Sequence, residues 1–127
     1  MQSNRKLSLL RRRLLTLIEN PAGKSLLDVF LAPGPLARGT VYTLRRKCSK
    51  PSCRCARGEP HTTVVLTASV QGRTRLWTLP PDRVGLAREW TERYRQFRQA
   101  RDRWVKWQRE ILRLIDAMGR SRIHPLP

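Results

Sequence analysis

The chain has 127 residues, which is enough for one domain, or one domain with an extension, but too short to enclose a large enzyme cleft. It carries 27 basic and 9 acidic side chains, a formal net charge of +18, so polyanions are its expected partners. Nucleic acid is the first candidate and an anionic membrane surface is its main competitor. No apolar run approaches the length of a membrane span.

An amphipathic helical segment is predicted at the N-terminus, within residues 1–31. Its leucines recur at three- and four-residue steps, as on one face of a helix: Leu7, Leu10, Leu14 and Leu17. The pair Asn20-Pro21 ends this helix, and residues 25–31 can add a short second one. The run APGPLARG, residues 32–39, holds two prolines and two glycines and is predicted to be a linker.

The pattern over residues 38–80 is that of a small antiparallel β-meander. The run TVYTLRRK, from Thr40, is rich in β-branched and aromatic residues and predicts the first strand. The run TTVVLTASV, from Thr62, predicts the second strand, and Gln71-Gly72 predicts a two-residue turn into a third, RTRLWTLP. All three cysteines of the chain lie in the loop that joins the first two strands.

A single long helix is predicted over residues 81–119, followed by a tail at 120–127. Five of its apolar residues lie seven apart, as in a coiled-coil seam: Trp90, Phe97, Trp104, Ile111 and Met118. We assign Arg101 and Gln108 to the alternate seam positions, where they weaken the seam in its middle, while Trp107 and Leu114 widen it toward the C-terminal end. We expect Gly119 to end the helix.

This helix would extend roughly 55 Å at about 1.5 Å per residue, which is longer than a three-stranded sheet can cover. The overhang therefore needs a partner: the N-terminal leucine stripe, a second protomer, or both. The residues expected at such an interface are Trp90, Tyr94, Phe97, Trp104, Trp107 and Ile111.

The cysteine loop has the spacing of a metal site, Cys48-x4-Cys53-x-Cys55-x5-His61. Three thiolates and one imidazole within so short a segment suit one tetrahedral zinc ion. An iron–sulfur cluster, a redox thiol site and three buried cysteines are the alternatives, although a cluster usually takes four thiolates. No base other than Glu59 lies nearby, so we expect a closed, structural zinc site and no enzyme activity.

Basic residues surround these four donors, and no acid occurs between Phe30 and Glu59. One or two cations can balance the net charge of about −1 that three thiolates leave around a zinc ion. The others are surplus and predict a surface for a phosphate backbone, which two arginines of the third strand extend. The predicted nucleic-acid contacts are Arg45, Arg46, Lys47, Lys50, Arg54, Arg57, Arg73 and Arg75.

The run GTVYTLRRKCSKPSCRCARGEPH resembles a family of small, functionally uncharacterised bacterial proteins, often encoded near transposases and other mobile elements. Their shared segment reads R-x-C-G-K-P-x-C-R-C-x-x-G-x-x-H, followed by strands and a long helix, and the correspondence covers about residues 38–98. Ser49 stands where the family usually has glycine, and Thr62-Thr63-Val64 replaces a usual proline–aromatic stretch. The resemblance implies, as shared metal ligands, Cys48, Cys53, Cys55 and His61.

These observations predict an α+β fold: a three-stranded antiparallel sheet with a zinc loop, flanked by an N-terminal helix and a long coiled-coil-like helix. The predicted function is that of a zinc-stabilised nucleic-acid-binding module, an accessory or regulatory protein of a mobile element, with DNA favoured over RNA because of the family context. The alternative is a protein-assembly module that docks through the long helix on a second copy or a larger protein, with zinc purely structural. An odd number of cysteines and no secretory signal predict a cytoplasmic location.

Overall fold

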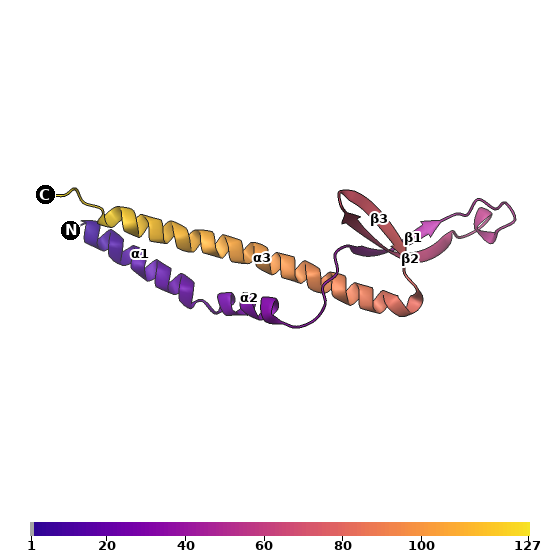
Figure 1. Ribbon diagram of the computed structural model, residues 1–127, viewed down its shortest axis with the longest axis horizontal. Helices are drawn as coiled ribbons and strands as arrows, with labels where there is room; N and C mark the ends of the chain where they lie inside the picture. Colours follow the sequence, from indigo (N-terminus) through magenta and orange to yellow (C-terminus); the bar gives the residue numbers. More distant parts are fainter. Residues whose placement is uncertain (1) are drawn as a thin grey trace. The chain divides into compact units, whose positions relative to one another are not determined.

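The computed structural model describes residues 2–127 and has the predicted α+β architecture (Figure 1). The α1 and α2 helices come first, a three-stranded sheet follows, and the long α3 helix closes the chain. The elements are α1 (Gln2–Glu19), α2 (Pro21–Leu31), β1 (Thr40–Arg46), the short 3-10 helix η1 (Arg54–Ala56), β2 (His61–Val70), β3 (Arg73–Thr78) and α3 (Pro81–Arg122). No helix in this described part of the chain is long and apolar enough to cross a membrane.

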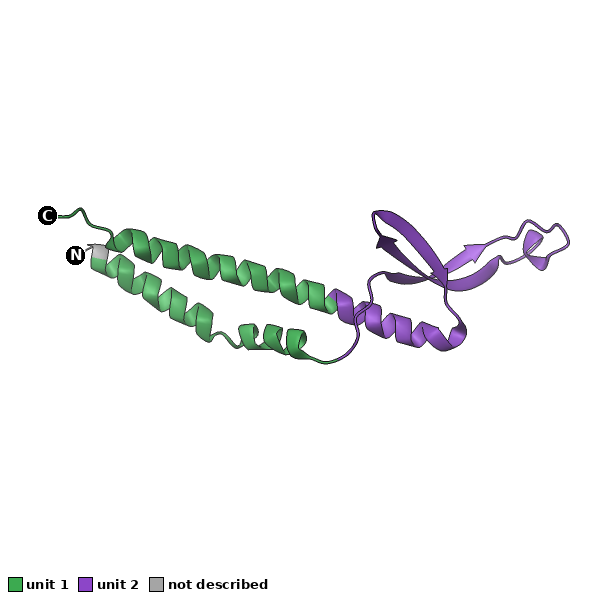
Figure 2. Cartoon of the chain, in the orientation of Figure 1, with its two compact units in different colours: residues 1–33, 96–127 green, residues 34–95 purple. Residues whose placement is uncertain are grey.

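The chain divides into two compact units, shown in different colours in Figure 2. Unit 1 comprises residues 1–33 and 96–127, and unit 2 comprises residues 34–95. The α3 helix therefore belongs to unit 2 in its first turns and to unit 1 thereafter. The sheet and the cysteine loop lie entirely in unit 2.

Unit 1 is a helical hairpin in which α1 and α2 run antiparallel to α3 (Figure 1). The predicted leucine stripe faces α3: Leu10 is buried, as are Ala100 and Leu114 on α3. The Asn20 side chain ends α1 and caps α2, because its oxygen accepts a hydrogen bond from the Ala22 N–H at 3.0 Å. The second helix consequently begins at Pro21, four residues earlier than the sequence pattern indicated.

Aromatic rings join α2 to α3 within unit 1. The Phe30 ring lies 5.4 Å from the Phe97 ring and 6.0 Å from the Trp104 ring, measured between centroids. The Trp107 indole N–H donates to the Leu17 carbonyl at 3.0 Å. The N-terminal segment therefore packs against the part of α3 that the sheet does not cover, as one of the predicted partners of this helix.

The seven-residue series of the α3 seam is as predicted, but the two residues assigned to alternate with it lie outside the seam. Phe97, Trp104, Ile111 and Met118 are half-buried, as expected, but Arg101 and Gln108 are exposed. The alternate positions belong instead to the residues three after each seam residue: Ala100, Trp107 and Leu114. A seam of 3-4 steps can use the residue three or four positions after each seam residue equally well. The residues three positions after are buried because α1 and α2 cover that side of α3.

The α3 helix also continues past Gly119 to Arg122, so the predicted end was wrong. A glycine in a helix interior costs only about 1 kcal/mol relative to alanine, and no proline follows until Pro125. Ser121 donates its hydroxyl to the Met118 carbonyl at 2.8 Å within this last turn.

The sheet of unit 2 has the strand order β1-β2-β3, with both neighbouring pairs antiparallel. The predicted turn is present: Gln71 and Gly72 both have positive φ, 51° and 79°, as a two-residue hairpin turn requires. Val65, in the middle of β2, has no exposed surface and is the centre of this small sheet. The β2 strand starts at His61, one residue before the predicted start, because His61 pairs with Arg46 of β1.

The linker before β1 contacts the first turns of α3, all within unit 2. The Ala37 N–H donates to the Trp90 carbonyl at 3.1 Å, and Arg93 donates to the Pro35 carbonyl at 2.8 Å. The Arg38 guanidinium lies 5.9 Å from the centre of the Tyr94 ring, which is the distance of a cation–π contact.

Candidate metal centre

The β1–β2 pairing brings the two ends of the cysteine loop together. The last register pair is Arg46 with His61, so the strand that leads into Cys48 ends beside the histidine. The separation of thirteen residues between Cys48 and His61 in sequence is therefore closed by the sheet, and the loop between them is anchored at both ends.

Short-range hydrogen bonds fold the loop back on itself. The Cys53 N–H donates to the Lys50 carbonyl at 3.1 Å, which reverses the chain after Pro51. The Ala56 N–H then donates to the Cys53 carbonyl at 3.1 Å and starts η1, so that Cys55 is turned into the interior and is only 1% exposed.

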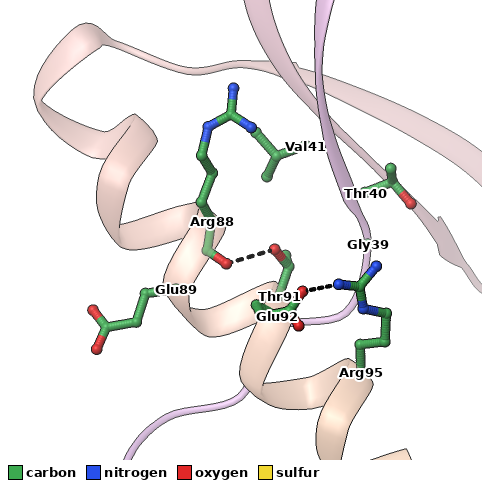
Figure 3. A pocket seen from close by; sticks show the side chains of 8 residues that line it. All are labelled: Gly39, Thr40, Val41, Arg88, Glu89, Thr91, Glu92 and Arg95. Atoms are coloured by element: carbon green, nitrogen blue, oxygen red, sulfur yellow. Dashed lines mark hydrogen bonds and ion pairs between the residues drawn. The ribbon is translucent and has the colours of Figure 1, made fainter.

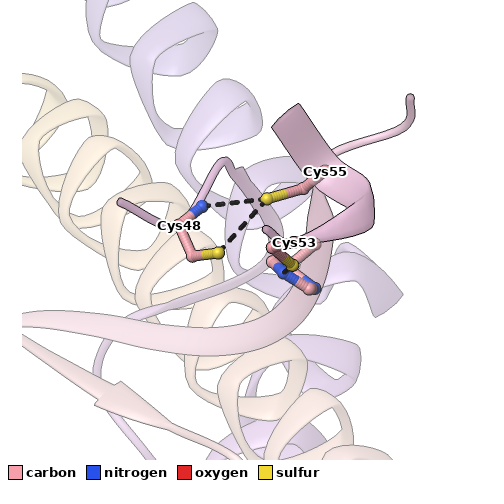
Figure 4. A group of neighbouring side chains, drawn as sticks. Cys48, Cys53 and Cys55 are labelled. Carbon is pink, nitrogen blue, oxygen red and sulfur yellow. Dashed lines mark hydrogen bonds between the residues drawn. The ribbon is translucent and has the colours of Figure 1, made fainter. Parts of the chain in front are cut away.

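The four predicted donors converge on one point. The Cys48 and Cys55 sulfurs are 3.3 Å apart, and the Cys53 sulfur lies 3.0 Å from His61 Nε2. All four ligand atoms lie within 4.8 Å of one another. Figure 4 shows the three cysteines pointing toward one another across the loop. A backbone N–H, that of Cys48, also donates to the Cys55 sulfur at 3.2 Å.

This geometry fits a tetrahedral metal ion. With Zn–S bonds of about 2.3 Å and Zn–N bonds of about 2.0 Å, a tetrahedral site separates its ligand atoms by roughly 3.5 to 3.8 Å. The observed separations bracket this range, so small side-chain adjustments bring all four donors to bonding distance. Three thiolates with one imidazole form a donor set that zinc prefers, and the backbone N–H bond to a sulfur is the kind of contact that orients a metal ligand.

The thiols differ in their acidity. Hydrogen bonding, first from the Lys50 backbone and then from the Cys55 and Cys53 thiols, lowers the pKa of Cys48 below its ordinary value. Desolvation by burial is the main cause that raises the pKa of Cys55. Cys48 therefore ionises before Cys55 in the metal-free chain. Because a metal binds thiolates, loading releases the Cys55 proton and weakens as pH falls.

Six basic residues in the cysteine loop and at the end of β1 are all exposed. Arg46 pairs with His61, whereas Arg45 pairs with Thr62 and lies on the opposite face of the sheet from the histidine. Within residues 2–127, none of the six side chains forms an ion pair with an acid or a hydrogen bond with a cysteine sulfur. We call this group the loop cations, and its members are Arg45, Arg46, Lys47, Lys50, Arg54 and Arg57.

The two predicted contacts on β3 lie elsewhere on the sheet. Arg73 pairs with Val70 and Arg75 with Ala68, at the turn end of the hairpin. Ala68 is seven residues from His61 along β2, which corresponds to roughly 23 Å. Residue parity along β2 also places the β3 arginines on the opposite face of the sheet from His61. They therefore form a second cationic site, which shares its strand face with the exposed Trp77.

A cavity elsewhere in unit 2 offers no comparable chemistry. It has a volume of about 580 Å³ and lies between the start of β1 and the first turns of α3 (Figure 3). Its charged residues balance, because Arg95 pairs with Glu92 and Glu89 pairs with Arg93 of the same helix. The lining residues are Gly39, Thr40, Val41, Arg88, Glu89, Thr91, Glu92 and Arg95.

Five of the six predicted interface residues of α3 make contacts within the chain, and the sixth, Ile111, is half-buried. Phe97, Trp104 and Trp107 contact the N-terminal helices in unit 1, while Trp90 and Tyr94 contact the linker in unit 2. Leu114 and Ala100 are more deeply buried than any of these five, and of the two only Ala100 was not predicted to lie in the seam. A strict count of three residues from Phe97 would have found Ala100.

Fold and site together define an α+β protein with a Cys3His cluster that can hold a metal ion such as zinc. The chain belongs to the family described as domain of unknown function DUF6788, which matches residues 6–93. This match covers α1 from Lys6, all of α2, the whole sheet with the cysteine loop, and the start of α3. No curated protein and no solved structure matches the chain.

Proposed function

We propose that this protein is a zinc-stabilised nucleic-acid-binding module that grips the phosphate backbone with its loop cations. DNA is the favoured ligand, the site has no catalytic role, and the protein works in the cytoplasm as an accessory of a mobile element. The observation that carries the proposal is the group of six exposed, unpaired cations in and directly before the loop that holds the four metal-ligand candidates.

Unpaired cations in such density oppose folding unless a ligand of opposite charge compensates them. The loop anchors them in fixed directions, because a bound metal would tie both ends of the loop and the turn at η1 into one rigid body. Phosphate oxygens are the ligand that arginine forks match best, and four of the six loop cations are arginines.

A tetrahedral metal bound by all four donors would have no open coordination position for water or substrate. A purely structural metal accounts for this donor set, and no catalysed reaction is needed to explain it. The metal would also stabilise the loop and so hold its cations in place for contact with a polyanion.

The rival hypothesis, a module that docks on a partner through the aromatic seam, has less support. The seam residues of unit 1 already contact α1 and α2, so docking there would first have to displace the N-terminal helices.

The test is the salt dependence of duplex binding for Lys50→Ala/Arg57→Ala. Each phosphate contact on a DNA duplex contributes about 0.9 to the slope of log K against log salt, so we expect the double variant to lower the slope by about 1.8. Binding should weaken equally for all sequences, and zinc content should stay unchanged. Arg54 is not part of the variant because it lies between two ligands.

The matched control is Lys106→Ala/Arg109→Ala, which removes the same charge from the exposed surface of α3. We expect its slope to equal that of the wild type. Equal slopes for the loop variant and the wild type, with equal zinc, would mean that the loop cations serve the thiolates and not a nucleic acid. A single-stranded oligonucleotide, compared under the same conditions, separates a duplex preference from general polyanion binding.

A further inference from the structure

Unit 1 has a side that its own helices leave uncovered. We name helix positions a to g so that the buried seam occupies a and d. The a residues are Phe97, Trp104 and Ile111 in α3, Leu7 and Leu14 in α1, and Gly23 and Phe30 in α2. In an antiparallel hairpin, the e positions of both helices meet on one side of the seam and the g positions meet on the other.

The g side exposes few large apolar side chains. The hollow between α1 and α3 on this side is lined by Arg13 and Thr16 of α1, by Asn20 directly after α1 and by Glu110 of α3, apart from its seam residues and Arg12. Glu110 is also paired with Arg113 on the same helix, at 3.3 Å. Only two large apolar residues of the unit 1 helices, Leu9 and Val29, are exposed on this side, at g or c positions.

The e side is apolar along α1, α2 and α3. Six exposed aliphatic residues occupy e positions or the adjoining b positions: Leu15, Ile18, Leu27, Leu31, Leu112 and Ile115. Their exposed fractions run from 42 to 79%, which for a leucine-sized surface of roughly 180 Å² gives about 600 Å² of apolar area on one side. We call these six residues the e-side patch.

We propose that a second copy of this chain packs on the e-side patch, so that two helical hairpins form one bundle about a two-fold axis. Only Leu10, Ala100 and Leu114 are buried apolar side chains among the described residues of unit 1, which is a small core for a hairpin of this length. Face-to-face packing of two hairpins is the usual way in which such a stripe becomes a four-helix core. The apolar patch and the polar atoms between its members approach the area of about 800 Å² per partner that stable dimers bury.

Charge complementarity also favours a second copy. The e side carries cations but no acids: Arg11, Lys24, Arg98, Arg101 and Arg122. Four of the five acids of these helical segments lie at the f positions that border it: Glu19, Asp28, Asp102 and Asp116. Within residues 2–127 none of these nine side chains forms an ion pair. Each copy thus offers both partners of new ion pairs.

The test is the mass of the full chain in solution, after nuclease treatment and at about 0.5 M salt, where surface electrostatics are largely screened. We expect twice the chain mass of 14.8 kDa by light scattering and by sedimentation equilibrium. The variant Ile18→Glu/Leu112→Glu should be a monomer, because it places four charges in the shared apolar layer of the dimer. The milder variant Ile18→Ala/Leu112→Ala, which keeps helical propensity, should weaken the dimer at least tenfold.

The matched control is Leu9→Glu/Val29→Glu, which makes the same change at the two exposed apolar residues of the g side. It should remain a dimer with the helicity of the wild type. A wild type that is a monomer from micromolar concentrations to about 100 µM would overturn the proposal. So would equal masses for the e-side and g-side glutamate variants, and so would an unchanged dimer in the alanine variant.

Discussion

Removal of the metal is expected to unfold the sheet of unit 2 and to leave most of the helix of unit 1 intact. The purified protein should contain about one zinc per chain, and Cys53→Ser should lose it. A structural zinc site of this kind contributes about 10 kcal/mol or more to folding, which exceeds what the few buried side chains of the sheet can supply. The two units should therefore respond differently to a chelator: unit 2 should unfold and unit 1 should stay folded.

The measurement combines metal analysis with amide hydrogen exchange, before and after chelation. Protection of the backbone amides from exchange should be lost in β1, which leads into Cys48, and in β2, which begins at His61. It should be largely kept in α3 beyond residue 96. Ser52→Ala, next to the mutated cysteine but outside the cluster, is the control and should keep full zinc content. A zinc stoichiometry near zero, with a melting curve that a chelator does not alter, would contradict the metal site. It would also contradict the metal-stabilised loop on which the proposed function depends.

Replacement of Trp104 by glutamate is expected to disrupt the helical hairpin. The Trp104 ring packs between Phe30 of α2 and Trp107 of α3, at centroid distances of 6.0 and 5.1 Å. Truncation of a packed tryptophan costs about 3 to 5 kcal/mol, and a carboxylate at the same place adds a desolvation penalty. The thermal midpoint and the helical circular dichroism signal should both fall, while zinc content should be unchanged.

Two variants make this result specific. Trp104→Phe keeps an aromatic ring at the contact and should retain most of the stability. Arg109→Glu places the same carboxylate on the exposed side of α3, and its melting curve should lie close to that of the wild type. If Trp104→Glu melts like the wild type with the same helicity, then the ring contacts with Phe30 and Trp107 do not hold the hairpin together.

The sequence by itself determined the kinds of elements and the donor set of the metal centre. Alternation of β-branched residues indicates strands, Gln71-Gly72 favours one turn geometry, and a 3-4 stripe indicates a helix, because each depends on local backbone preferences. Cys48, Cys53, Cys55 and His61 are close in sequence, so their convergence needs only one hairpin and one turn. The nucleic-acid contacts and the lack of enzymatic activity remain predictions.

The tertiary structure decided the points at which two local choices are nearly equal in free energy. Arg101 and Ala100 satisfy the same 3-4 spacing from Phe97, and only the side on which α2 packs selects Ala100. Gly119 is tolerated inside α3 because its cost of about 1 kcal/mol is small beside the packing of the hairpin. The placement of Arg75 away from the metal loop likewise follows from strand register, a property of the paired sheet that no single strand carries.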